Sequence, residues 1–174
     1  SGCKSLYTLK IPSKLQRISD YTFSKCISLT EIKIPGNIRE IGYKSFSGCS
    51  GLREISIPST VKTVGIGAFE NCTELKDISL PTTLTEINYY TFSGCTSLTT
   101  LTLHSKLTAI NNYAFAGCKS LTEIHCKNSN PPLIGENTFR DVNRIGCKIF
   151  VPSKRAKKSY STALYWNEFT IYIE

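Results

Sequence analysis

The sequence predicts an α/β-type repeat solenoid in which each coil contributes one short parallel β-strand. Two observations support this prediction. Six cysteines recur in equal steps of 23, at Cys3, Cys26, Cys49, Cys72, Cys95 and Cys118. Between successive cysteines one apolar pattern returns, C-x-x-L-x-x-I-x-I-P-x-x-L-x-x-I-x-x-x-x-F-x-x. A fixed period of this length is typical of stacked repeats, because each unit buries its apolar faces against its neighbours.

The unit that begins at Cys26 shows what each position contributes. Ile32 and Ile34 alternate with Lys33, which predicts a short strand with one buried face. Pro35 follows directly and has no backbone donor, so we expect the chain to turn there. The next apolar pair returns the chain past the core, and the phenylalanine near the end of each unit fills the interior. Aromatic rings stacked in this way add about 0.5 to 1.5 kcal/mol beyond their buried area.

The six repeated cysteines are predicted to be buried free thiols. Stacked coils lie about 4.8 Å apart, a distance that a disulfide could bridge. However, side chains at one position of a repeat run parallel to each other and do not point at one another. Cys126 and Cys147 lie outside this series. A disulfide involving either of them remains open.

The sequence predicts one domain with two parts. Residues 1–139 form a solenoid of about six coils, and residues 140–174 form its C-terminal cap. His104 stands where earlier units have proline, as the repeat changes toward its end. In the cap, Ser153 is a plausible N-cap of a short helix, and Tyr160 and Leu164 are expected to face the last coil. Residues 170–174 alternate again and predict a final strand. A cap of this kind shields the end of a solenoid core.

The net charge of +8 comes from 21 Lys and Arg residues against 13 Asp and Glu residues. Residues 140–174 hold seven basic and three acidic side chains, so they supply 7 − 3 = 4 of these charges. Acidic partners are therefore worth considering. No run of about 18 to 20 apolar residues predicts a transmembrane segment, and the first residues do not have the pattern of a signal peptide.

The outward positions of the predicted strands form the first candidate site. If these positions bind a ligand, the candidate residues are Tyr7, Lys10, Glu31, Lys33, Arg53, Glu54, Lys76, Asp77, Glu123 and His125. The alternative is that opposite charges in neighbouring columns simply keep a solvated sheet soluble. Few aromatic anchors, which dominate protein interfaces, are found on these strands.

Tyrosines form a second candidate, the tyrosine patch, on the return side of the coils. Its members precede the phenylalanine of their unit by two or three positions, at Tyr21, Tyr43, Tyr89, Tyr90 and Tyr113. They either cover the edge of the coil or form a contact patch, since tyrosine combines a large contact area with a polar tip.

A third candidate is the basic patch of Lys154, Arg155, Lys157 and Lys158, with Arg140, Arg144 and Lys148 nearby. It could bind an acidic polysaccharide or a membrane surface, or it could be the solvated face of the helix. Nucleic acid is not expected as a partner, because no recognition fold for it is present.

No catalytic or metal site is predicted, and no cofactor is expected. The two histidines are His104 and His125, and strand alternation turns Cys126 away from His125. Cysteines separated by a whole repeat do not have the short spacing of zinc ligands. Phosphate-binding loops and nucleophile elbows are also absent from the sequence. The sequence therefore favours a protein that is not an enzyme.

The unit C-x-S-L-T-x-I-x-I-P-x-x-L-x-x-I-x-x-x-A-F-x-G-C, clearest across residues 72–118, resembles the leucine-rich repeats of the BspA-like type. The closing segment, with a strand ending in Val-Pro, a helix with Ala-Tyr and then Trp-x-x-Phe, is also similar to that family. The resemblance implies a right-handed leucine-rich-repeat coil that is mostly strand and loop, with a short helix in its C-terminal cap.

The resemblance also implies a role. Proteins of this type are found at the surface of host-associated bacteria and of some protists, or are secreted by them. The expected function is therefore an extracellular, non-enzymatic adhesion module whose extended surface binds a host protein, an extracellular-matrix protein or a ligand on another cell's surface. The alternative is a stiff structural spacer between an anchor and another binding domain. Neither a signal sequence nor an anchor is expected within these 174 residues.

Overall fold

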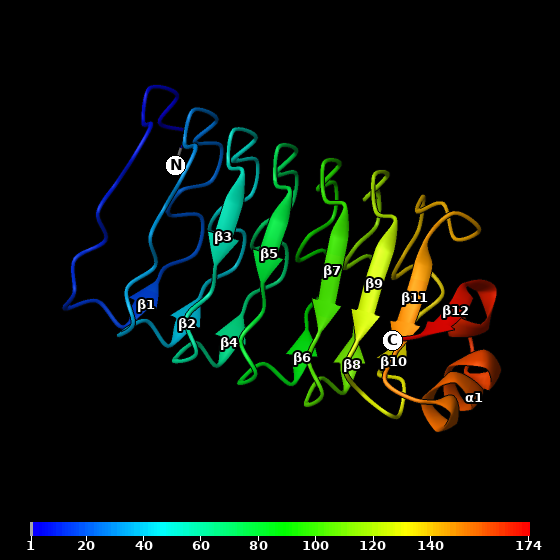
Figure 1. Ribbon diagram of the computed structural model, residues 1–174. Helices are drawn as coiled ribbons and strands as arrows, with labels where there is room; N and C mark the ends of the chain where they lie inside the picture. The colour runs from blue at the N-terminus through cyan, green and yellow to red at the C-terminus, as the bar shows by residue number, and fades with distance from the viewer. Residues whose placement is uncertain (1) are drawn as a thin grey trace.

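The computed structural model describes residues 2–174, which form a parallel β-solenoid whose coils stack along one axis (Figure 1). The predicted repeat architecture is confirmed. In the coil that begins at Cys26, Ile32 and Ile34 are buried and Lys33 is exposed, as the alternation predicts. Leu9 occupies the position of Ile32 one coil earlier and is 38% exposed, because no coil within residues 2–174 covers its outer side.

The larger row of strands forms one face of the solenoid, which we call the strand face. It begins with a parallel bridge between Lys10 and Lys33. The strands that follow are β3 (Glu54–Ser56), β5 (Asp77–Ser79), β7 (Thr100–Leu103), β9 (Glu123–Cys126), β11 (Lys148–Val151) and β12 (Thr170–Ile173). β3 pairs with β5, and β7, β9, β11 and β12 form one parallel sheet. The sheet therefore continues from the coils into the cap.

A second series of two-residue strands runs along the return side of the coils. These strands are β1 (Arg17–Ile18), β2 (Glu40–Ile41), β4 (Thr63–Val64), β6 (Glu86–Ile87), β8 (Ala109–Ile110) and β10 (Leu133–Ile134). They form two parallel sheets of three strands each. The sequence predicted the apolar residues of this side but not its hydrogen-bonded strands. Two residues are too few to show a period-two pattern.

A stack of phenylalanine rings fills the interior along the solenoid axis. The stack runs through Phe23, Phe46, Phe69, Phe92, Phe115 and Phe139, with neighbouring ring centroids 5.1 to 5.6 Å apart. At its C-terminal end, Trp166 and Phe169 meet Phe139 edge-on, at 5.7 and 5.5 Å. The cap therefore closes the aromatic core.

All eight cysteines are free, and every one except Cys3 is buried. Four of the repeated thiols donate a hydrogen bond to the carbonyl oxygen of the phenylalanine 26 positions earlier, one turn back along the solenoid. For example, Cys49 Sγ lies 3.0 Å from Phe23 O and Cys72 Sγ lies 3.3 Å from Phe46 O. These bonds direct the sulfur atoms at backbone groups and not at each other. Burial raises the pKa of Cys49 and Cys118 to about 12.

The turn after each strand follows the prediction made from proline. The carbonyl of Pro35 accepts from the amide of Ile38, and Pro58 and Pro81 accept in the same way from the residues three positions on. His104 accepts the corresponding bond from Leu107, so it keeps the turn although it is not proline.

The cap contains helix α1 (Lys154–Thr162), the short 3₁₀ helix η1 (Trp166–Glu168) and β12. Ser153 caps α1, because its Oγ accepts from the amide of Ala156 at 3.1 Å. Tyr160 is fully buried, as predicted. The prediction for Leu164 is wrong: this side chain lies beyond the end of α1 and is 70% exposed.

Candidate ligand-binding surface

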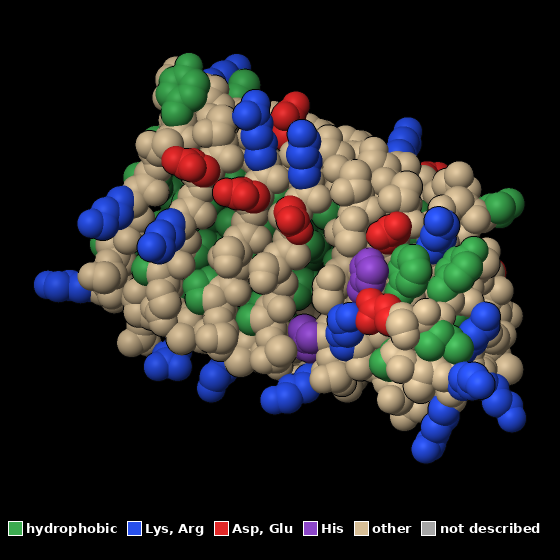
Figure 2. Space-filling view, in the orientation of Figure 1, with side chains coloured by type: hydrophobic (Ala, Val, Ile, Leu, Met, Phe, Trp, Pro, Cys, Tyr) green, Lys and Arg blue, Asp and Glu red, His purple; other side chains and the backbone are tan. Residues whose placement is uncertain are grey.

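Three carboxylates on the N-terminal half of the strand face form what we call the acidic row: Glu31, Glu54 and Asp77. All three are exposed. Glu54 and Asp77 lie opposite each other in the register of β3 and β5, and Glu31 has the same place one coil earlier. Figure 2 shows acidic side chains in a line across this face, with basic groups on either side. The predicted alternation of charged columns is therefore present.

None of the three carboxylates has a cationic partner within 4.0 Å in the described part of the chain. Arg53 is adjacent to Glu54 in sequence, but it pairs with Glu74 at 3.7 Å. Like charges opposite each other on neighbouring strands repel. The carboxylates of the acidic row therefore form no ion pair among the described residues, although lysine and arginine side chains lie on either side of the row.

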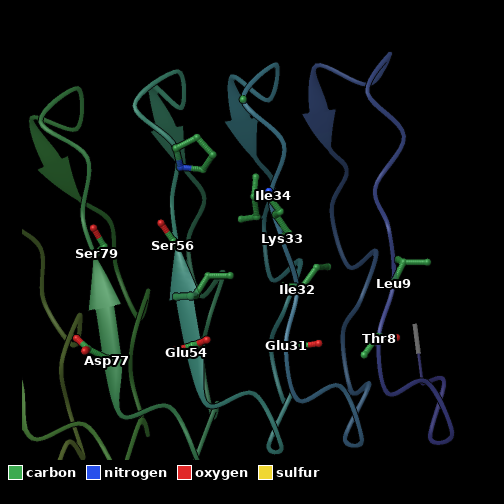
Figure 3. Close-up of a pocket in the computed structure, with 13 residues that line it drawn as sticks. Thr8, Leu9, Glu31, Ile32, Lys33, Ile34, Glu54, Ser56, Asp77 and Ser79 are labelled. Atoms are coloured by element: carbon green, nitrogen blue, oxygen red, sulfur yellow. The ribbon is translucent and has the colours of Figure 1, made fainter.

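An open groove with a volume of about 800 Å³ runs along the acidic row. Its walls come from four successive coils, from Thr8 and Leu9 to Asp77 and Ser79 (Figure 3). Lys33 also lines the groove, and its backbone forms the bridge to Lys10 in the neighbouring coil. The groove thus combines carboxylates, an ammonium group and an exposed leucine, a combination that suits a polypeptide ligand.

The C-terminal half of the strand face has a different character. His125 lies between Thr102 of β7 and Phe150 of β11 in the register of the sheet, and Phe150 lies beside Tyr172 of β12. The rings of His125 and Phe150 are stacked at 4.8 Å, and those of Phe150 and Tyr172 are 5.7 Å apart. We call His125, Phe150 and Tyr172 the aromatic row.

Phe150 and Tyr172 were missed by the sequence analysis, which found few aromatic anchors on the strands. They come from the cap, and only the pairing of β11 and β12 with β9 places them on the strand face. The available signal was the alternation in K-I-F-V and T-I-Y-I, which turns Phe150 and Tyr172 outward.

A small network of ion pairs borders the aromatic row. His125 Nδ1 lies 2.5 Å from Glu174 Oε1, and His125 Nε2 lies 3.5 Å from Glu123 Oε2. Lys127 Nζ lies 2.5 Å from the other oxygen of Glu174. Hydrogen bonds from Lys127 and His125 hold the pKa of Glu174 below its usual value. Among the described residues, the carboxylates at this end of the face therefore form ion pairs, whereas those of the acidic row do not.

The remaining predicted strand-face residues are Tyr7, Lys10 and Lys76, which are exposed on the same face. Tyr7 is 64% exposed and lies in the first coil, close to Thr8 of the groove. The structure therefore brings the strand-face candidates to one surface but divides them into an acidic half and an aromatic half.

The tyrosine patch lies on the return side, two or three residues after β1, β2, β6 and β8. It falls into two clusters. Tyr21 and Tyr43 meet edge-to-face at 5.1 Å, whereas Tyr90 and Tyr113 are stacked at 4.9 Å next to Tyr89. All are exposed except Tyr113, which is half-buried. Ile66, 40% exposed, occupies the corresponding place in the intervening coil.

His125 and Cys126 are adjacent in sequence but lie on opposite sides of β9. Cys126 points into the core and His125 outward, as expected from alternation. His104 is buried in its turn, and desolvation lowers its pKa. Residues 2–174 contain no group of three or more side chains placed to hold a metal ion. In the same range, no helix is long and apolar enough to cross a membrane.

Stacked parallel coils, with one strand face and an interior of repeated leucine, cysteine and phenylalanine, define a leucine-rich repeat solenoid. The family described as "BspA type Leucine rich repeat region (6 copies)" matches residues 1–122 and 40–162. The chain belongs to this family. No curated protein matches the sequence at a significant level.

Several solved bacterial structures are similar to this chain. A leucine-rich cell surface protein of Faecalibacterium prausnitzii is 26% identical over 90% of this chain, with a TM-score of 0.67. A leucine-rich repeat protein of T. pallidum is 28% identical over 68% of the chain, with a TM-score of 0.65. A leucine-rich repeat protein from Bacteroides ovatus is 24% identical over 99% of this chain, with a TM-score of 0.65. At this identity the similarity supports the fold alone. The chain spans 51%, 58% and 56% of these three proteins, respectively.

Proposed function

We propose that this chain is a non-enzymatic, extracellular or cell-surface module that binds a host or extracellular-matrix protein through its strand face. The observation that carries the proposal is the acidic row, whose three carboxylates line a groove and have no cationic partner within 4.0 Å in residues 2–174. Proteins bind one another through complementary potentials, which raise the rate and the specificity of association. We therefore expect the bound segment to carry lysine or arginine side chains.

Two further observations support this proposal. Leucine-rich repeat proteins are generally protein-binding, and one similar structure is a protein described as a cell surface protein. The aromatic row adds apolar contact area on the same face, beyond the groove. Aromatic anchors beside charged groups are typical of protein interfaces.

The test is a binding measurement against a panel of purified fibronectin, fibrinogen, laminin and collagen. The variant Glu31→Gln/Glu54→Gln/Asp77→Asn removes the charge of the acidic row and changes side-chain size little. Its matched control is Glu86→Gln/Glu136→Gln/Asp141→Asn, which removes three exposed acids elsewhere. We expect the first variant to weaken saturable binding at least about tenfold, or about 1.4 kcal/mol, and the control to bind as the unmodified chain does. Equal binding by all three proteins, or no binding to any panel member, would overturn the proposal.

A structural spacer is the second candidate function. It is favoured by the unbroken stack of rings from Phe23 to Phe139, which couples every coil to the next. Such a stack makes a stiff rod whose length depends on the number of coils. If the chain binds no panel member alone but the longer protein that contains it does, the spacer is supported.

A further inference from the structure

The first turns of α1 carry two pairs of basic residues separated by one alanine, in the segment S-K-R-A-K-K-S. Basic clusters of this length are recurrent sites for polyanions, including heparin. Successive residues of an α-helix are about 100° apart. Lys157, Lys154, Lys158 and Arg155 therefore follow one another around a single arc of roughly 160°. All four are exposed, so α1 presents one continuous cationic face.

The opposite side of α1 is fixed to the cap. Ala156 and Tyr160 are fully buried. The Tyr160 ring meets Trp166 edge-on at 5.2 Å, and Trp166 Nε1 donates to the carbonyl of Pro132 at 2.8 Å. Together with the hydrogen bond to Ser153, these contacts fix the rotation of α1 about its own axis. The cationic face is consequently pre-organised and points away from the core.

The cationic face has no counter-charge of its own. No acidic side chain lies within 4.0 Å of any of the four cations in residues 2–174, and the first turn of α1 contains no acid. The nearby acids are engaged elsewhere: Glu168 pairs with Arg144, and Glu174 pairs with Lys127 and His125.

This arrangement is electrostatically unfavourable for the chain alone. Like charges three or four positions apart on a helix repel, as Lys154 does with both Lys157 and Lys158. Cations at a helix N-terminus also oppose the helix dipole. A bound polyanion would remove both penalties, since it would neutralise the repulsion and would also interact well with the positive end of the dipole.

We propose that the exposed face of α1 binds a linear acidic polysaccharide through its sulfate or carboxylate groups. A membrane surface is the less favoured ligand. A helix that lies in a membrane interface inserts an apolar face, and the apolar face of α1 is already used to pack the cap. The four cations lie within residues 154–158, about 6 Å along the helix axis, so together they face a short segment of a longer anionic chain. This site is separate from the groove, and neither proposal depends on the other.

The test is binding of the full chain to immobilised heparin across a salt series. The variant Lys154→Gln/Arg155→Gln/Lys157→Gln/Lys158→Gln should bind roughly tenfold to a hundredfold more weakly, because exposed charge pairs contribute modestly but additively. It should also show a shallower dependence on salt, since fewer counterions are released. Replacing the three lysines with arginine instead should preserve binding.

The matched control is Arg39→Gln/Lys62→Gln/Lys106→Gln/Lys119→Gln, which removes the same charges from exposed coil positions. If this control weakens heparin binding as much as the α1 variant does, the attraction is due to net charge and the proposal fails. Chondroitin sulfate and hyaluronate distinguish sulfate from carboxylate recognition. Stronger binding to phosphatidylserine vesicles than to any of these polysaccharides, lost in the α1 variant, would assign α1 to membranes and overturn the proposal. Thermal melts of all variants establish that each is folded.

Discussion

Glu54 and Asp77 face each other across the parallel pair of β3 and β5, and neither carboxylate has a cation within 4.0 Å among the described residues. Directly opposed like charges cost a strand pair roughly 0.2 to 1 kcal/mol. The strand face therefore holds a charge arrangement that is unfavourable for folding and available to a ligand.

Removing one of these charges should stabilise the chain. We expect Glu54→Gln to raise the free energy of unfolding by a few tenths to about 1 kcal/mol in urea denaturation. Asp77→Asn should act similarly, and the double variant should gain less than the sum, because the two charges repel each other. Glu136→Gln, at an exposed site outside the strand pairs, is the control. A loss of stability in Glu54→Gln would show that the Glu54 carboxylate makes a favourable interaction in the folded chain that outweighs its repulsion by Asp77.

The buried thiols should be chemically silent in the folded protein. Cys3 is exposed, while the other seven cysteines are buried. Thiolates are the reactive form, and burial raises the pKa of Cys118, Cys126 and Cys147 to about 12. We expect a thiol reagent at pH 8 to modify one cysteine rapidly in the native chain and all eight after denaturation. Rapid native modification of several thiols, or fewer than eight in denaturant, would contradict the buried, reduced series.

The same thiols should make stability fall at alkaline pH. Burial raises the folded-state pKa of Cys118 from about 9 to about 12. Between these values the unfolded chain has lost the thiol proton and the folded chain has kept it. The unfolded state then binds fewer protons, so the free energy of unfolding decreases as pH rises, by up to about 1.4 kcal/mol per pH unit for each such thiol.

The variant Cys118→Ala isolates this effect, because ionisation of the lysines and tyrosines is common to both proteins. We expect the stability difference between the unmodified chain and Cys118→Ala to be constant below pH 9 and to shrink above it. The measurement is urea denaturation at several pH values. Parallel curves throughout would mean that the thiol ionises as readily in the folded chain as in the unfolded one.

Replacing a phenylalanine of the stack by alanine should lower the free energy of unfolding most in the middle of the stack. Phe69 is fully buried between Phe46 and Phe92, at 5.2 and 5.5 Å. Phe69→Ala should cost about 3 to 5 kcal/mol, from lost burial and the cavity left behind. Phe23 is 9% exposed and stacks on Phe46 alone among the rings of the series, so Phe23→Ala should cost less. Equal losses in thermal or urea denaturation would argue against a core built from nearest-neighbour contacts.

The stability of the cap should depend on Tyr160 and not on Leu164. Tyr160 is fully buried against Trp166, and its replacement by alanine should cost about 3 kcal/mol or more. Leu164 is 70% exposed, so Leu164→Ser should change the free energy of unfolding by no more than about 0.5 kcal/mol. Thermal denaturation of the two variants checks this assignment. A large loss in Leu164→Ser would restore the packing role that the sequence predicted for it.

The sequence predicts correctly those features that depend only on residues close together in the chain. Alternation places Ile32, Lys33 and Cys126 correctly, because it depends only on neighbours along the strand. Leu164 was misplaced because it lies just beyond the helix end, where the helical pattern no longer applies. His104 kept the turn of its coil because the bond uses its backbone carbonyl, which any residue supplies.

The amino-acid sequence by itself determined the length of the coil, the interior series of leucine, cysteine and phenylalanine, and the columns of outward residues. These features return every 23 residues from Cys3 to Cys118, and each follows from local alternation and burial. Only the tertiary structure decided which outward residues meet. The pairing of β11 and β12 with β9 brings Phe150 and Tyr172 beside His125. Among the described residues, the distances across the face leave Glu31, Glu54 and Asp77 without a cation within 4.0 Å. Contacts of this kind depend on the register between strands and on side-chain reach, which local pattern does not specify.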